Sequence, residues 1–165
     1  MTAQRDNELW RFSLAVYVRD GVSQECLTLQ DTLDIDVNVL LFCAWTGARG
    51  VVLSKVDIAT ASHAVSAWQE KVIRPLRGVR CELKSLSGND STRPKVKEIE
   101  LEAEQIEQAM LFAHWQSNEN TRAKTTSHDA IEQNVKEYIA TKSSGAQAPL
   151  SAPHLIDAAR RFGPA

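Results

Sequence analysis

The sequence contains few residues that interrupt a helix, with seven glycines and five prolines among 165 residues. It has three cysteines, Cys26, Cys43 and Cys81, which lie far apart and form no paired Cys-x-x-Cys motif. These counts argue against a disulfide framework and against a cysteine-based zinc site. We expect the three thiols to be reduced and to pack as small apolar side chains in a cytoplasmic protein.

Long apolar runs are missing as well. The longest run, VLLFCAW at residues 39–45, is far too short to span a bilayer. The first ten residues, MTAQRDNELW, are polar and lack the apolar centre of a signal peptide. We therefore expect no membrane association and a cytoplasmic location.

Neither sign of charge is in large excess, since the formal net charge is −2 at pH 7. A chain with this balance has no general basic field to attract nucleic acid, so we disfavour a nucleic-acid partner. The four histidines show no metal-binding spacing, and no phosphate-binding glycine loop or nucleophile motif is present. The sequence therefore predicts no cofactor and no metal, and it identifies no catalytic residue.

Apolar residues at helical spacing dominate the rest of the chain and predict an all-α fold. We expect a bundle of five main helices, near residues 7–19, 22–33, 37–49, 54–86 and 96–113. The third is apolar at 9 of its 13 positions, which is typical of a central, buried helix. Pro75 should kink or break the fourth helix. The turn at 87–94 should make the fourth and fifth helices an antiparallel hairpin.

The domain organisation follows from a change in composition after the fifth helix. We predict a helical bundle domain at residues 1–116 and a variable C-terminal extension at 117–165. Within the extension, Ser127 should cap a helix that ends near Lys142, and residues 143–153 have the composition of a linker. One further short amphipathic helix is expected at residues 154–162.

The most polar stretch before an apolar run is QDTLDIDVNVLLF, at residues 30–42. Its acidic spacing begins like a calcium-binding loop, but the required glycine is Val39 and the required glutamate is Trp45. It also differs from an aspartate-rich box that holds magnesium. We expect Asp36 to cap the third helix. Asn38 is then either a structural tie to a neighbouring loop or the polar end of a pocket.

Basic residues accumulate in the second half of the predicted fourth helix, at Lys71, Arg74, Arg77, Arg80 and Lys84. The facing fifth helix is rich in glutamate, so complementary charges should flank the apolar seam of the hairpin. Arg74 and Arg77 point away from that seam in an ideal helix. Because they are three residues apart, they either present two guanidinium groups to a small anion or form a solvated basic face.

Four tryptophans, Trp10, Trp45, Trp68 and Trp115, are spread one to a helix, and we expect most of them in the core. The fifth predicted helix has its apolar seam at Val96, Ile99, Ala103, Ile106, Met110 and Ala113. Phe112 and Trp115 lie off this seam. They must therefore be buried against the C-terminal helices or against another chain.

Several short patterns resemble a known family: Trp10-x-x-Ser13-Leu14-x-x-Tyr17, Cys26-Leu27-x-Leu29-Gln30-Asp31, Asp36-Val37-Asn38-x-Leu40-Leu41 and Trp68-x-x-x-Val72-x-x-Pro75-Leu76-Arg77. With these, residues 8–115 resemble a family of small conserved hypothetical proteins from proteobacteria. The resemblance implies a bacterial, cytoplasmic protein. It brings no activity and no catalytic residues.

Two functions compete at this point. The first is a non-catalytic helical module that binds protein, either a second copy or another chain, with Phe112 and Trp115 as candidate contacts. The alternative is a small-molecule binder or small enzyme with a pocket between the third and fourth helices. Its candidate lining is Asp36, Asn38, Trp45, Arg49, Trp68, Glu70, Arg74 and Arg77, and its ligand would be a small anion.

Overall fold

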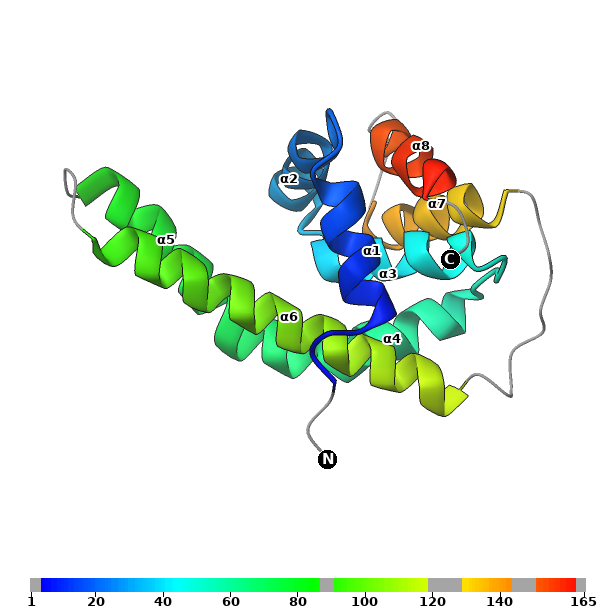
Figure 1. Cartoon of the computed structure of the whole chain (residues 1–165), viewed down its shortest axis with the longest axis horizontal. Coiled ribbons are helices and arrows are strands. Elements are labelled where there is room, and N and C mark those ends of the chain that lie inside the picture. Colours follow the sequence, from blue (N-terminus) through cyan, green and yellow to red (C-terminus); the bar gives the residue numbers. More distant parts are fainter. Residues whose placement is uncertain (1–3, 87–90, 119–128, 144–150, 163–165) are drawn as a thin grey trace.

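The computed structural model describes residues 4–86, 91–118, 129–143 and 151–162, and within them the fold is all-α, without strands (Figure 1). The elements in chain order are α1 (Glu8–Tyr17), α2 (Val22–Leu33), α3 (Val37–Ala48), α4 (Lys55–Trp68), the π-helical turn η1 (Gln69–Ile73), α5 (Arg74–Leu86), α6 (Thr92–Asn118), α7 (Ala130–Lys142) and α8 (Pro153–Arg161). The predicted all-α class is therefore confirmed. In this part of the chain no helix combines the length and the apolar content that a membrane span requires.

Helix α3 lies at the centre of the fold. Ten of its twelve residues are buried, and α1, α6, α7 and α8 surround it. Its start is set by Asp36, whose carboxylate accepts hydrogen bonds from the backbone N–H groups of Asn38 at 2.9 Å and Val39 at 3.4 Å. The apolar sequence drives this helix inside, and the polar residue before it satisfies its first donors.

The start of α4 is determined by a reciprocal cap, as its sequence predicts. The hydroxyl of Ser54 accepts from the backbone N–H of Asp57, and the Asp57 carboxylate accepts from the backbone N–H of Ser54. This capping box uses residues only three apart, so the sequence alone is enough to place it.

The two C-terminal helices complete the same core. Gly47 allows α3 and α7 to approach closely, since a Cβ atom there would lie 2.4 Å from the Cα of Ile131. Buried Asn134 of α7 accepts from the Leu53 N–H at 2.8 Å and donates to the Val51 carbonyl at 2.8 Å. A side chain of α2 caps helix α8: the Glu25 carboxylate accepts hydrogen bonds from the first backbone N–H groups of α8.

The predicted C-terminal extension therefore contributes buried helices to the core. The predicted helices at its two ends are present as α7 and α8. Ser127, most of the predicted linker and residues 163–165 lie outside the described residues.

Pro75 does not break the helix; the chain widens one turn before it. The backbone N–H of Arg74 donates to the carbonyl of Gln69, five residues earlier, in place of four. A widened turn moves the carbonyl of residue 71 away from the proline ring, which a regular helix would bring into collision. The extra residue also rotates all later side chains by roughly 100° about the helix axis.

The structure corrects two predictions about the hairpin. Arg77 does not point away from α6; it forms ion pairs with two glutamates there. The buried face of α6 is also not the predicted apolar seam, because Ile99 is 53% exposed whereas Glu100 and Glu107 are buried. The spacing of apolar residues could not reveal this, because arginine–glutamate pairs occupy part of the contact between α5 and α6.

Helix α5 and residues 92–103 of α6 extend away from the other helices, and we call this hairpin the arm (Figure 1). Within the arm, α5 packs against α6, and it also contacts the adjoining π turn. No residue of α5 is buried. Cys81 lies on the arm and is exposed, whereas Cys26 and Cys43 are buried thiols. The prediction that all three cysteines pack among apolar residues is therefore wrong for Cys81.

Candidate functional site

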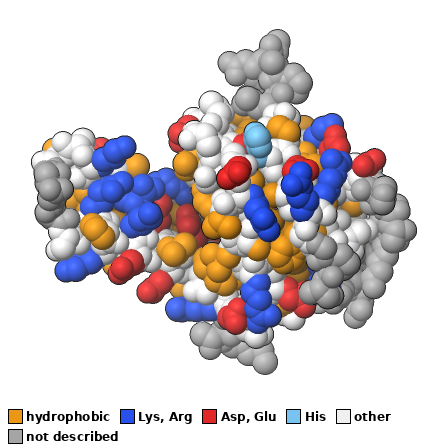
Figure 2. Space-filling view, turned by 45° about the horizontal axis from the view of Figure 1, so that its top comes forward, with side chains coloured by type: hydrophobic (Ala, Val, Ile, Leu, Met, Phe, Trp, Pro, Cys, Tyr) orange, Lys and Arg blue, Asp and Glu red, His pale blue; other side chains and the backbone are white. Residues whose placement is uncertain are grey.

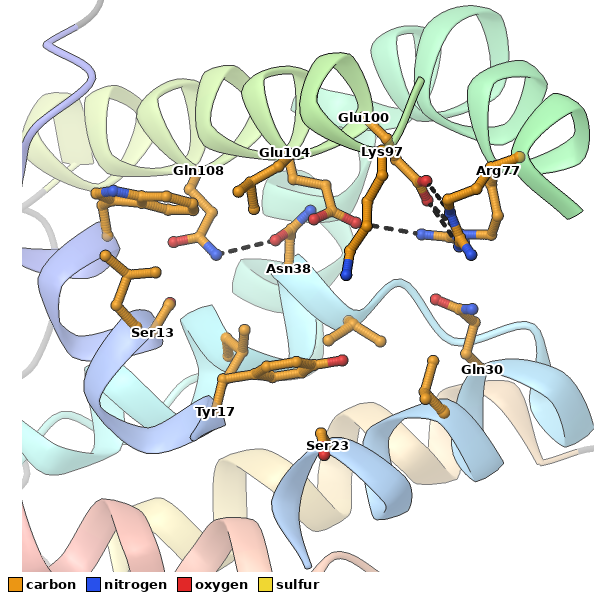
Figure 3. A pocket seen from close by; sticks show the side chains of 17 residues that line it. Ser13, Tyr17, Ser23, Gln30, Asn38, Arg77, Lys97, Glu100, Glu104 and Gln108 are labelled. Atoms are coloured by element: carbon orange, nitrogen blue, oxygen red, sulfur yellow. Dashed lines mark hydrogen bonds and ion pairs between the residues drawn. The ribbon is translucent and has the colours of Figure 1, made fainter. Parts of the chain in front are cut away.

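A cavity of about 400 Å³ lies where the base of the arm meets the body of the protein. Side chains from α1, α2, α3, α5 and α6 line it (Figure 3). Its apolar walls are formed by Trp10, Leu14, Leu27, Val37, Leu41 and Leu101. Helix α1 supplies one wall with residues 10, 13, 14 and 17, which share one face of a helix because of their spacing.

A buried polar network lies behind one end of this cavity. The side-chain N–H of Asn38 donates to Oε2 of Glu107 at 2.6 Å, and the side-chain N–H of Gln108 donates to Oδ1 of Asn38 at 2.9 Å. Asp36 adjoins Glu107 in this network, and Oε1 of Glu107 has no hydrogen-bond partner among the described residues. Glu107, Asn38 and Gln108 thus form a continuous hydrogen-bonded chain that leads to the cavity.

The acid pair in this network holds a proton at neutral pH. Burial, together with the neighbouring Asp36, raises the pKa of Glu107 to about 9. Burial also raises the pKa of Asp36, but the two backbone N–H groups at the start of α3 favour its ionised form. Glu107 is therefore the protonated member of the pair.

Two buried polar atoms at the same end of the cavity have no partner. The hydroxyl oxygen of Ser13 and Oε1 of Gln108 make no hydrogen bond with any described residue. Ser13 is 3% exposed and Gln108 is 2% exposed. A buried polar atom without a hydrogen bond is costly, so these atoms mark a place where a bound molecule gains affinity.

Charged side chains line the opposite end of the cavity. Nε of Arg77 lies 3.3 Å from Oε1 of Glu100, and its Nη2 lies 3.5 Å from Oε1 of Glu104. Arg80 also forms an ion pair with Glu100. Lys97 reaches from α6 toward the cavity, and it has no ion pair with any residue that the structure describes (Figure 3). Burial raises the pKa of Glu104 as well, which weakens the acidic side of this cluster.

Residues 8–111 match the profile of a family described as "Protein of unknown function (DUF2390)". The chain belongs to this family. No curated protein and no solved structure matches the chain. Every residue that lines the cavity falls between positions 10 and 108, inside the part shared with the family, whereas α7 and α8 lie outside it.

The family domain brings only some of the predicted site residues together. Asn38 and Arg77 line the cavity, and Asp36 lies directly behind Asn38. The predicted fourth helix spans α4, η1 and α5; its last part, α5, contributes Arg77 and Arg80 to the lining, whereas α4 contributes none. Within the described residues, no group of three or more histidines, cysteines, aspartates or glutamates is arranged to hold a metal.

The remaining predicted residues lie away from the cavity. Trp45 packs with Phe112 and Trp115 in an aromatic cluster, with ring centroids 5.8 and 5.3 Å away. Trp115 is thus buried within its own chain, against α3. Arg49 lies over the Trp45 ring at 5.2 Å and pairs with Glu8.

Three further predicted residues lie in α4, η1 and α5. The indole N–H of Trp68 donates to the carbonyl of Ala103 at 2.9 Å, which ties α4 to α6. Glu70 is exposed. Arg74 pairs with Asp34 at 2.5 Å, so Arg74 and Arg77 do not present two free guanidinium groups to one anion.

Ser13, Tyr17, Lys97 and Gln108 line the cavity but are not among the predicted site residues. Ser13 carries a signal that the sequence does contain, because it is a hydroxyl on the apolar face formed by Leu9, Phe12 and Val16. No sequence signal marks Gln108, because it follows the glutamate-rich part of α6 and looks like an ordinary solvated residue.

Proposed function

We propose that the protein binds a small molecule in the cavity between the arm and the body. The observation that carries this proposal is the pair of buried, unpartnered polar atoms of Ser13 and Gln108 at the end of an apolar cavity of about 400 Å³. This volume lies within the usual range for small-molecule sites, which are mostly apolar with a few placed polar groups. Burial raises the pKa of Tyr17 to about 12, so its phenol stays neutral beside such a ligand.

Filling the cavity tests this function. We expect fragments from a general library to bind the wild-type protein in ligand-observed NMR, and we expect Ser13→Leu to weaken them at least about tenfold. The leucine removes the hydroxyl and occupies cavity space. Ser85→Leu, at an exposed position on the arm, is the matched control and should bind like the wild type. If no fragment binds in a way that Ser13→Leu reduces, the proposal fails.

As a second function, we propose that the arm pairs with the arm of a second copy. Four large apolar side chains on the arm are strongly exposed: Val79 at 50%, Leu101 at 50%, Ile99 at 53% and Leu86 at 77%. The tip of the arm carries exposed Lys84, Arg93 and Lys95, and exposed Glu102 lies near its base. Figure 2 shows Lys and Arg side chains gathered on the arm. Antiparallel pairing about a two-fold axis would place the basic tip of one copy beside Glu102 of the other.

Light scattering tests this pairing against the monomer mass of 18.3 kDa. We expect a dimer at micromolar concentration and a monomer for the double variant Val79→Lys with Ile99→Lys. Val56→Lys on α4, where the side chain is 70% exposed outside the arm, is the control and should remain a dimer. A wild-type protein that stays monomeric at high concentration would rule the pairing out.

A further inference from the structure

We infer that the cavity takes a small ligand with a hydrogen-bond donor at one end and an anionic group at the other. This inference rests on the proposed small-molecule function and specifies its ligand. It follows from the direction of the buried hydrogen-bond chain and from the charges at the opposite end.

The direction of the chain is set at the start of α3. Two backbone N–H groups of that helix point at the Asp36 carboxylate. In its ionised form this group accepts hydrogen bonds and cannot donate them. Oε2 of buried Glu107 accepts from the amide N–H of Asn38 at 2.6 Å. The amide nitrogen of Asn38 is thereby directed at Glu107, and its oxygen is left facing Gln108.

The same logic fixes the orientation of Gln108. Because the Asn38 oxygen must accept, Gln108 presents its N–H to it at 2.9 Å. The other atom of the Gln108 amide, Oε1, is therefore left at the cavity wall, where it can only accept. A ligand must offer this atom an N–H or O–H group, and the Ser13 hydroxyl at the same end can accept or donate (Figure 3).

The opposite end favours a negative charge. Five charged residues line it, namely Arg77, Arg80, Lys97, Glu100 and Glu104, so three cations face two acids. The two arginines are already paired with the glutamates. Lys97 has no such partner in the described part of the chain, and a carboxylate or phosphate would supply one.

The distance between the two ends limits the size of the ligand. Lys97 and Gln108 lie eleven residues apart on α6, or roughly 16 Å between their Cα atoms. Both side chains reach into the space between them, which leaves a span of roughly 10 Å for the ligand. The apolar walls at Leu41 and Leu101 between the ends suit a ring or a short alkyl chain. The class is a small organic acid with a hydroxyl or amino group at its far end.

A matched set of probes tests both ends by isothermal titration. The reference is 3-(4-hydroxyphenyl)propionate. The phenyl and 4-methoxyphenyl analogues lack the donor, the corresponding propanamide lacks the charge, and 2-(4-hydroxyphenyl)ethyl phosphate replaces the carboxylate. We expect loss of the donor or of the charge to weaken binding about tenfold each. The ratio between the carboxylate and phosphate probes identifies the preferred anion.

Two variants assign these preferences to named atoms. Gln108→Leu should bind the hydroxyphenyl and phenyl acids equally while still preferring acid over amide. Lys97→Gln should bind acid and amide equally while still preferring the hydroxyl. Lys95→Gln, an exposed lysine that does not line the cavity, is the control and should keep both preferences. Thermal melting of each variant checks that it is folded.

The results separate this inference from the proposed function. If fragments bind in a way that Ser13→Leu reduces, but the probes show no preference for the donor or the anion, the ligand class is wrong and the binding function stands. The ligand class is equally wrong if the preferences survive in both variants. If neither fragments nor probes bind, both proposals fail.

Discussion

Replacing Glu107 by glutamine should make the protein more stable than the wild type at alkaline pH, and the difference should grow as the pH rises. Glu107 is 0% exposed, and its pKa in the folded protein is about 9, well above 4.5. The stabilisation that comes from its bound proton is complete below about pH 4.5 and is lost as the pH rises through the folded value. A glutamine mimics the protonated acid, because it is neutral at every pH and its oxygen can accept from Asn38.

Urea unfolding between pH 4.5 and 9 measures this effect. The two proteins should be nearly equal in stability at pH 4.5, and the variant should lead by about 2 kcal/mol or more at pH 8.5. Glu102→Gln, at an exposed position of the same helix, is the control and should follow the wild type. Parallel curves for the wild type and Glu107→Gln would mean that Glu107 is ionised in the folded protein and would contradict the prediction. An ionised carboxylate still only accepts from Asn38, so the orientation of Asn38 and Gln108 would be unchanged.

A chain that ends at Asn118 should lose cooperative folding altogether. Truncation there removes α7 and α8, whose side chains Val135, Tyr138 and Leu155 are almost completely buried. Each large buried apolar side chain contributes about 1.5–3 kcal/mol, and a whole domain is stable by only about 5–15 kcal/mol. The truncation also leaves the Val51 carbonyl and the Leu53 N–H without the amide of Asn134.

Circular dichroism during heating tests the truncation. We expect reduced helix content and no sharp transition for the chain that ends at Asn118. A chain that ends at Phe162 lacks only residues 163–165, and as the control it should melt like the full chain. A cooperative transition of the shorter chain near the full-length Tm would establish that residues 1–116 form a domain by themselves, as the change in composition suggests.

The pocket shows where prediction from sequence stops. Asn38 is recognisable as a polar residue on a nearly all-apolar helix, so a buried role for it follows from α3 alone. Its partners Glu107 and Gln108 lie 69 and 70 residues away, and they belong to a glutamate-rich helix whose exposed and buried acids look alike in sequence. Only their position against α3 distinguishes the buried acid from the solvated ones.

The all-α class and most helix limits follow from the residue order alone, among them α2 at residues 22–33 and the capping box that starts α4. These features depend on side chains within one or two turns of each other, and such local interactions can be read directly from residue order. Packing between helices fixes four other features: the π turn before Pro75, the face that α6 buries, the proton on Glu107 and the cavity itself. Each of these depends on desolvation and on contacts between distant helices, and the same residue types in water would have ordinary charges and no fixed partners.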